Sequence, residues 1–442
     1  MLRILNKSII PLIIGIVVLC SSNIQWGGDK WKDIIEADGK GYYAYLPAMF
    51  IYHDLNFSFF DGVEKRYPNP HIFYDYRIGT DGGVVDKYYV GTAVAMAPFF
   101  FCAHVFAVEK DGYSAIYPIM INVAAIFYLL IALIYNRKLL RMFGASDGMI
   151  SFILVAIVFA TNVFYYTVSE PAMSHIYSFA FVSMFLYFVR KFFDKPDKRS
   201  IIAVSLLLAM IILIRPVNGI IFLLFPFMAG KVETIKKSLR WLSENKGTVV
   251  LSVLLFLIVT GIQLIIYKIQ TGHFFVYAYG SETFNWSNPH PLDFLFSYKK
   301  GLFVYTPLIF LSLYGVLMFF KRNTFQFYSL IFFTILLLYV LSSWWNWWYG
   351  GSFSSRVSME YFPIAAILLW VAYVEIKSKI TRGIFLALIT LCILLSQVQT
   401  YQYRYYHIHW EKMDKEHYWR VFMRIDLVGK ENPNQDLLDS KL

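Results

Sequence analysis

Long apolar stretches alternate with short polar or basic segments along most of this chain. A helix that crosses a bilayer needs about 20 mostly apolar residues, within a range of roughly 17–25. The segments that fit or approach this length are residues 8–24, 115–135, 148–165, 174–190, 200–214, 217–229, 248–268, 302–320, 324–343, 359–375 and 382–398. The pattern therefore predicts an all-α polytopic membrane protein with about 11 transmembrane helices.

Residues 89–107 are also apolar, and the distribution of Lys and Arg decides how they are interpreted. Short loops rich in Lys and Arg stay on the cytoplasmic side of the membrane. Arg3 and Lys7 place the N-terminus in the cytoplasm, and the later basic loops join it there only if residues 89–107 do not cross. We therefore expect this segment to be a re-entrant or interface-lying helix.

This topology divides the chain into a transmembrane domain, residues 1–400, and an extracytoplasmic tail, residues 401–442. The largest outer segment, residues 25–114, carries 12 acidic and 8 basic residues and is expected to hold interface helices. The cytoplasmic loops are too short for a catalytic domain. Function is therefore expected on the outer face.

The composition agrees with a membrane protein, because 58% of the 442 residues are hydrophobic and 19% are aromatic. The formal net charge of +11 could indicate nucleic acid, but the basic residues follow the predicted cytoplasmic loops. Contact with anionic lipid headgroups explains that distribution, so we expect membrane lipids and no nucleic acid as partners. The three cysteines all lie in apolar segments and predict no disulfide framework.

Two carboxylates, Glu36 and Asp38, begin the most informative motif, Glu36-Ala-Asp-Gly-Lys-Gly-Tyr-Tyr43. A carboxylate at hydrogen-bonding distance from an incoming hydroxyl or amine acts as a general base. The residues from Tyr43 to Tyr52 suggest a short aromatic interface helix, and Tyr42 and Tyr43 are candidates for sugar or acceptor binding. A capping turn in a wet loop is the alternative interpretation.

A second motif holds four tryptophans among residues 344–348 and a single outer cation, Arg356. Arginine suits bidentate phosphate recognition, and the faces of Trp344, Trp347 and Trp348 suit sugar rings or prenyl chains. An interface anchor with a snorkelling arginine is the alternative.

Three further sites carry polar groups near the outer boundary. Arg215, before Pro216, is a candidate phosphate ligand or a structural salt bridge. Glu170 and His175 are candidates for positioning an acceptor, or Glu170 belongs to a helix start. Lys299 and Lys300 are candidate lipid-phosphate ligands, or they simply end a helix at the headgroups.

The tail contains His407, His409 and His417 at a spacing that matches no zinc pattern. A solvated amphipathic helix is the better interpretation of this segment. We therefore expect no metal and no bound cofactor.

Together the motifs resemble the GT-C superfamily of integral-membrane glycosyltransferases, which includes protein O-mannosyltransferases and lipid A aminoarabinose transferases, and the chain is most similar to Bacteroidetes members. The resemblance covers most of residues 1–400 and rests on the order of five motifs. They are Glu36-Ala-Asp-Gly-Lys-Gly-Tyr-Tyr43, Tyr88-Tyr-Val-Gly-Thr-Ala-Val-Ala-Met-Ala-Pro98, Arg215-Pro216, Lys300-Gly-Leu-Phe-Val-Tyr-Thr-Pro307 and Trp347-Trp-Tyr-Gly-Gly-Ser-Phe-Ser-Ser-Arg356.

The resemblance implies an inverting sugar transfer from a polyprenyl-phosphate donor to a glycan, lipid or protein acceptor. It also implies a bacterial inner membrane location with the active site facing the periplasm. Asp38, or Glu36, would be the base, and Arg356 and Arg215 would hold the donor phosphate. Two departures are Ala37 between the acids, where several relatives have adjacent acids, and Ser355 before Arg356, where a glycine is expected.

Two other function classes remain open at this point. A transporter or flippase of lipid-linked saccharide would use the same aromatic and cationic groups, but it should show repeated halves and charges near mid-membrane. An O-antigen polymerase or ligase usually has its large outer loop late in the chain, whereas here that loop follows the first span.

Overall fold

The computed structural model describes residues 2–68 and 73–427. They form two compact units. We call Ile10–Leu139 with Tyr166–Glu282 the N-terminal unit, and Met1–Ile9, Leu140–Tyr165 and Thr283–Leu442 the C-terminal unit. Helices α1, α5 and α7 contribute residues to both units.

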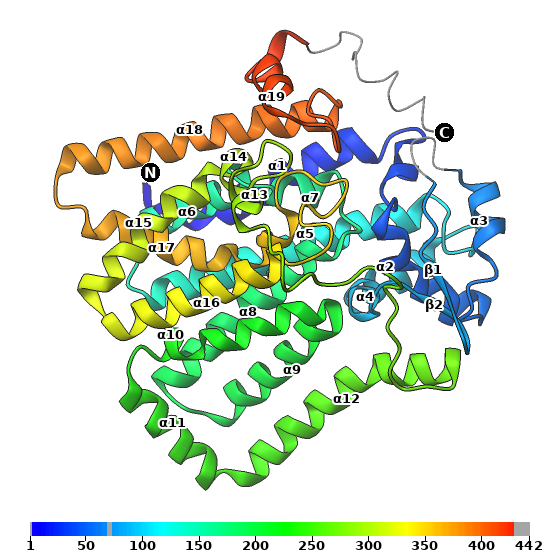
Figure 1. Cartoon of the computed structure of the whole chain (residues 1–442), viewed down its shortest axis with the longest axis horizontal. Coiled ribbons are helices and arrows are strands. Elements are labelled where there is room, and N and C mark those ends of the chain that lie inside the picture. Colours follow the sequence, from blue (N-terminus) through cyan, green and yellow to red (C-terminus); the bar gives the residue numbers. More distant parts are fainter. Residues whose placement is uncertain (1, 69–72, 428–442) are drawn as a thin grey trace. The chain divides into compact units, whose positions relative to one another are not determined.

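The N-terminal unit contains the first outer segment and several long helices (Figure 1). Its elements are α1 (Leu2–Gln25), η1 (Lys30–Asp33), α2 (Asp38–Pro47), η2 (Ala48–Tyr52), α3 (Phe60–Arg66), β1 (Arg77–Thr80), β2 (Gly83–Asp86), α4 (Gly91–Phe106), α5 (Ile116–Met142), α8 (Ser174–Asp194), α9 (Lys198–Ile214), η3 (Pro216–Leu224), α10 (Phe225–Ala229), α11 (Val232–Glu244) and α12 (Lys246–Thr271). Helix α9 packs against both α8 and α12.

The C-terminal unit is built mainly on α17, which packs against α6 and α15. Its elements are α6 (Asp147–Phe159), α13 (Pro291–Phe296), α14 (Leu302–Tyr305), α15 (Pro307–Arg322), α16 (Thr324–Ser342), η4 (Arg356–Tyr361), α17 (Phe362–Glu375), α18 (Lys379–Arg404), α19 (Lys415–Val421) and η5 (Ile425–Leu427). Helix α7 (Val163–Val168) begins in this unit and ends in the other.

The predicted all-α polytopic architecture is confirmed, but fewer helices reach full length than the eleven predicted. Among the described residues, seven helical segments are long and apolar enough to cross a membrane. They are Ser8–Gln25, Ile116–Met142, Ser174–Asp194, Lys246–Thr271, Thr324–Ser342, Arg356–Glu375 and Lys379–Arg404. The other four predicted spans form shorter or broken helices, because α6, α9 and α15 have only 13, 17 and 16 residues.

The remaining predicted segment, residues 217–229, is separated from residues 200–214 at Arg215-Pro216, where the sequence allows a broken pair or a hairpin. Pro216 restricts Arg215 to an extended conformation, with φ −150° and ψ 109°, and this ends α9. The chain continues as the 3₁₀ helix η3 and the short α10, and it then bends by 114° into α11. The basic segment after residue 230, predicted as a loop, is therefore mostly helical.

The apolar segment 89–107 forms α4, whose 16 residues are fewer than a typical span requires. It packs against α2, α8 and α9. A methyl group at Gly91 would overlap the backbone of Leu213, so this glycine permits the close contact with α9. Whether α4 lies at the interface stays a prediction.

The first part of the expected aromatic interface helix after Tyr43 is buried, whereas Phe50 near its end is exposed. Helix α2 and the π-helical turn η2 cover these residues, and Tyr43 and Tyr45 are fully enclosed by protein. The Tyr43 hydroxyl donates to the carbonyl of Gly112, and that of Tyr45 donates to the carbonyl of Tyr88 at 2.8 Å. These two aromatics hold residues 25–114 together, and whether this helix lies at the membrane interface stays a prediction.

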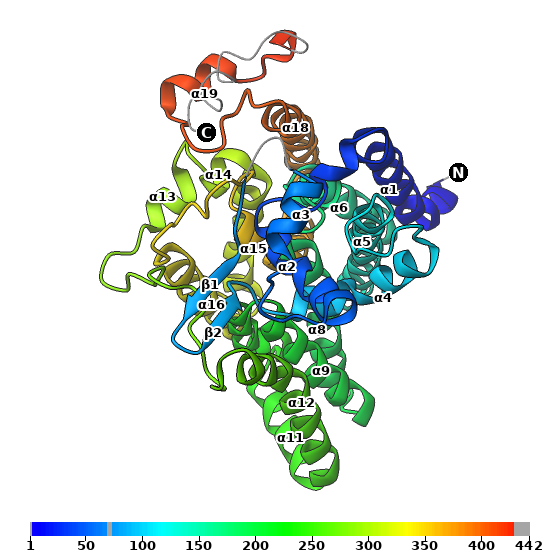
Figure 2. The ribbon, with the colours of Figure 1, turned by 90° about the vertical axis from the view of Figure 1, so that its right-hand side faces the viewer.

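An antiparallel hairpin of β1 and β2, which the sequence analysis did not predict, completes this outer segment (Figure 2). Arg77 pairs with Asp86 and Thr80 with Gly83, so a two-residue Asp81-Gly82 turn joins the strands. Asp-Gly is a favoured hairpin turn because both positions tolerate positive φ.

The tail differs from the expected solvated helix. After α18 ends at Arg404, His407 and His409 are buried. The Nδ1 atom of His409 accepts hydrogen bonds from the backbone N–H groups of Glu411 and Lys412, at 2.9 and 2.8 Å. Burial lowers the pKa of His409 to about 4, so this imidazole stays neutral at physiological pH. Residues 428–442 of the predicted tail lie outside the described part of the chain.

Replacing Gly315 by Ala should destabilise the protein, because a β-carbon there would overlap the backbone of Leu368 in α17. We expect a loss of about 1–3 kcal/mol, measured as a lower midpoint of thermal unfolding in detergent. The matched control is Gly261→Ala in α12, where nothing lies within 4 Å and the better helix former should raise stability slightly. Equal effects of the two variants would contradict this view of the α15–α17 contact.

Candidate active site

Asp38 is the first residue of α2 and follows a strained turn. The backbone N–H of Gly39 donates to the carbonyl of Glu36 at 2.9 Å, and Ala37 between them has φ 46° and ψ −131°. Positive φ at this position of a type II′-like turn normally calls for glycine. Such strain costs on the order of 1–3 kcal/mol and is concentrated at functional sites. The turn places the Asp38 carboxylate at the positive end of the α2 dipole.

Two glycines let α2 start very close to its neighbours. A β-carbon at Gly39 would lie 2.8 Å from Cβ of Ala172. One at Gly41 would overlap the Tyr88 ring and lie 2.9 Å from Oδ1 of Asp86. The start of α2 is thereby fixed against the segment that leads to α8 and against the segment before α4.

The negative charge of Asp38 acts on two buried tyrosines, Tyr88 and Tyr279. The Tyr42 and Tyr88 rings are 4.4 Å apart. Burial raises the pKa of Tyr88 well above its usual range, and the negative charge of Asp38 raises it further. Burial also raises the pKa of Tyr279, with Tyr42 and Asp38 adding to the increase. The hydroxyls of Tyr88 and Tyr279 therefore stay protonated close to Asp38.

Arg215 brings a positive charge to the same cluster, since it acts against the pKa increase of Tyr279. Its Nη1 lies 3.2 Å from Nδ1 of His175, which is 99% buried in the first turn of α8. A guanidinium donates only, so an imidazole nitrogen accepts in this contact. The backbone N–H of Asn218 donates to the Arg215 carbonyl at 2.9 Å and holds this corner.

The N-terminal unit thus brings Asp38 and Tyr42 of α2 and the distant Arg215 into the surroundings of Tyr279, and Arg215 against His175. Half-buried Glu170 lies in the segment whose Ala172 packs on Gly39, and its carbonyl accepts from Met173 N–H at 3.2 Å. Tyr43 faces away into the core, so its place in the structure is that of a packing residue.

The C-terminal unit holds the other predicted residues around the loop that precedes η4. Half-buried Arg356 is the first residue of η4. Ser354 just before it has φ 58°, and its hydroxyl hydrogen bonds to that of Thr306 at 2.8 Å. The loop before Arg356 is therefore held in one conformation by its polar contacts.

Both predicted phosphate-binding lysines have partners inside this unit. Lys300 is buried, donates to the carbonyl of Ser352, and lies 4.9 Å from the centre of the Tyr403 ring. Lys299 pairs with Glu411 at 2.8 Å and lies 3.6 Å from the centre of the Trp348 ring. In this structure both lysines support the loop that carries Arg356.

The tryptophans do not form one cluster. Trp344 packs edge-on against Phe284 at 4.8 Å, and Trp347 stacks over His290 at 6.2 Å. Trp347 and Trp348 contact each other at 5.5 Å. Tryptophans that are close in the sequence therefore pack against different aromatic rings.

The sequence matches no protein-family model and no curated protein. Among solved structures, the fold is similar to that of the Archaeoglobus fulgidus oligosaccharyltransferase in its apo form, with a TM-score of 0.55. The two chains are 12% identical, and the match covers 98% of this chain and 59% of that chain. This chain has a GT-C-like membrane fold. The likeness concerns the fold alone, and the chain spans less than two thirds of the archaeal protein.

Tyr88 and Tyr279 are functional candidates that the sequence analysis missed. Tyr88 is the first residue of one of the motifs that carry the family resemblance, so the sequence could have pointed to it. Tyr279 lies in a loop without any distinguishing pattern. No group of three or more His, Cys, Asp or Glu side chains suited to a metal ion occurs among residues 2–68 and 73–427, and the expectation of a metal-free reaction stays a prediction.

The strain at Ala37 predicts an unusual substitution pattern. Ala37→Gly should keep or raise stability, because glycine adopts positive φ without steric cost. Ala37→Val should lower stability by about 2 kcal/mol or more, because a β-branched residue is strongly disfavoured there. Thermal unfolding of the purified variants measures both effects. Equal tolerance of glycine and valine would show that the turn is not strained.

Proposed function

We propose that the chain is a glycosyltransferase that moves a sugar from a polyprenyl-phosphate donor to an acceptor on the extracytoplasmic face of the membrane. The GT-C-like fold supports the reaction class. The observation that carries the assignment is the cluster of Asp38, Arg215 and two protonated tyrosines, Tyr88 and Tyr279, in one unit. A carboxylate and a guanidinium that both act on the same buried tyrosine hydroxyl suit deprotonation of an acceptor beside a leaving phosphate.

In the proposed reaction, the Asp38 carboxylate takes the proton of the acceptor hydroxyl. The acceptor oxygen bonds to the anomeric carbon from the face opposite the lipid phosphate. The bond from that carbon to the phosphate oxygen breaks, and its electron pair leaves with the phosphate, which inverts the anomeric configuration. Asp38 is preferred to Glu36 because its charge acts on both tyrosine hydroxyls.

Arg215 would stabilise the negative charge that develops on the departing phosphate. Its contact with the buried His175 orients the guanidinium. Within the C-terminal unit, Arg356 on its braced loop is proposed as a phosphate ligand, with Lys299 and Lys300 acting through that loop. Trp344, Trp347 and Trp348 are proposed to contact the sugar or the prenyl chain, and Glu170 to contact the acceptor.

Asp38→Asn should bind the donor normally but transfer sugar roughly 10²–10⁴-fold more slowly, because the base is lost while the size of the side chain is kept. Glu36→Gln is the matched control and should retain most activity. The measurement is single-turnover transfer by purified protein with a polyprenyl-phosphate sugar. Full transfer by Asp38→Asn would refute the assignment of the base, and donor movement across the bilayer without any transfer would favour a transporter.

Arg215→Lys and Arg356→Lys should each weaken transfer by roughly 100-fold, because lysine keeps the charge but loses the bidentate fork. The loss should appear in both kcat and the KM for the donor, and not in the KM for the acceptor. Arg141→Lys is the control, since Arg141 is 54% exposed and pairs with Asp147. If either lysine variant kept wild-type kinetics, that arginine would not contact the phosphate.

A further inference from the structure

A small cavity opens in the first outer segment, next to α2 and α3. Its volume is about 40 Å³, enough for roughly three water molecules. It is lined by Trp31, Lys32, Ile35, Lys40, Phe60, Val63, Glu64, Tyr67, Tyr76, Tyr113 and Pro118. Every lining residue belongs to the N-terminal unit, and none belongs to the cluster around Asp38.

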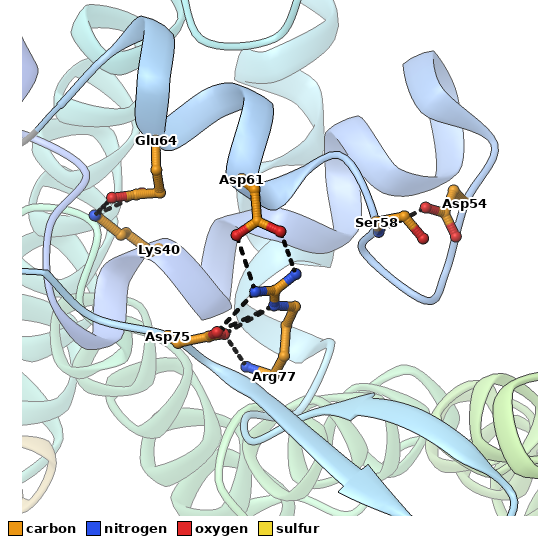
Figure 3. Close-up of polar contacts among 7 residues, drawn as sticks. All are labelled: Lys40, Asp54, Ser58, Asp61, Glu64, Asp75 and Arg77. Atoms are coloured by element: carbon orange, nitrogen blue, oxygen red, sulfur yellow. Dashed lines mark hydrogen bonds and ion pairs between the residues drawn. The ribbon is translucent and has the colours of Figure 1, made fainter.

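A buried ion pair forms the polar part of this cavity. The Lys40 ammonium donates to both Glu64 carboxylate oxygens, at 2.7 and 2.9 Å (Figure 3). The side chains of Lys40 and Glu64 are only 9% and 16% exposed. Burying such a pair has a large desolvation cost, and an apolar pair of similar volume is often equally stable. Its presence beside a cavity therefore suggests a recognition role.

The rest of the lining is aromatic with hydroxyl groups. The Phe60 and Tyr76 rings pack edge to face at 5.3 Å, and Trp31 packs edge-on against Tyr67 at 5.8 Å. Burial raises the pKa of Tyr76 and Tyr113 well above the usual range, so both hydroxyls remain hydrogen-bond donors. Aromatic faces beside a few fixed polar groups are typical of small-molecule sites.

The charges of the cavity are balanced, which selects for a neutral ligand. Lys40 is compensated by Glu64, and Lys32 at the edge lies 3.2 Å from Asp29. The nearby Arg77 is held by Asp61 and Asp75, at 3.3 and 2.8 Å (Figure 3). A phosphate would find no uncompensated cation among these groups, whereas hydroxyl groups can both accept from the ammonium and donate to the carboxylate.

We infer that this cavity binds the hydroxyl-bearing edge of a neutral sugar residue. Lys40 lies two residues after Asp38 on α2, and successive helical residues turn by about 100°, so the two side chains leave the helix on nearly opposite sides. The cavity is thus a second subsite, separate from the proposed base. This inference rests on the proposed function in one respect, because the sugar bound in the cavity would belong to the acceptor. The favoured acceptor class is therefore a glycan.

Direct binding tests the subsite without any turnover. The full chain carrying Asp38→Asn is reconstituted in lipid nanodiscs, so that no alkyl-glycoside detergent competes. Neutral methyl glycosides of several hexoses and N-acetylhexosamines are titrated by saturation-transfer NMR, and inorganic phosphate is then added as an anionic competitor. We expect at least one glycoside to bind and phosphate not to displace it.

Two variants locate the binding. Val63→Phe fills the cavity and leaves the ion pair intact, and Glu64→Gln removes the carboxylate; each should weaken glycoside binding at least tenfold. Val108→Phe is the matched control, because Val108 is 99% exposed and does not line the cavity. If Glu64→Gln fails to fold, Val63→Phe still decides the question.

The inference is overturned if no glycoside binds, if Val63→Phe binds as well as the control, or if phosphate competes for the cavity. These outcomes leave the transfer assay with Asp38 and Glu36 variants unaffected. Conversely, loss of the proposed transferase activity would leave the binding result standing. The two proposals can therefore fail separately.

Discussion

The start of α2 packs so closely against neighbouring segments that two of its positions accommodate no β-carbon. Gly39 contacts Ala172, and Gly41 contacts Tyr88 and Asp86. Because Asp38 lies between this contact and the strained Ala37, its backbone has little freedom. The arrangement of the candidate base, the tyrosines around it and the segment leading to His175 all depend on this contact.

Charge placement follows from that packing. Inside a protein an uncompensated charge is costly, so buried ionic groups need partners. The N-terminal unit meets this requirement in two different ways. Arg215 contacts the buried imidazole of His175, whereas Lys40 and Glu64 pair with each other. Helix α2 therefore carries the candidate base at its first residue and an ion-paired lysine two residues later.

The C-terminal unit uses its cations differently. Lys300 and Lys299 donate to Ser352 and Glu411 and lie against aromatic rings. The strained Ser354, tied to Thr306, completes the support of the loop before Arg356. A loop held in this way loses less conformational entropy when Arg356 engages a ligand.

The sequence by itself determined the membrane class and the seven full-length spans, because sustained hydrophobicity is a local property that a bilayer reads directly. It also singled out Asp38 and Arg215, because charged groups beside glycine, proline and aromatics stand out in an apolar chain. Hydropathy also marked segments that form shorter or broken helices, since it does not register where a helix ends, as at Arg215 before Pro216 or in the 13 residues of α6. The Asp81-Gly82 turn was a local signal that an all-helical interpretation passed over.

Only the tertiary structure decided which of these residues meet. Lys40 and Glu64 are 24 positions apart, and Arg215 and His175 are 40 apart, so no spacing rule relates them. Burial of Tyr43 likewise depends on Gly112, which arrives from a distant turn. Local sequence controls helix formation and membrane partition. Contacts between distant side chains depend instead on long-range packing, to which the whole chain contributes.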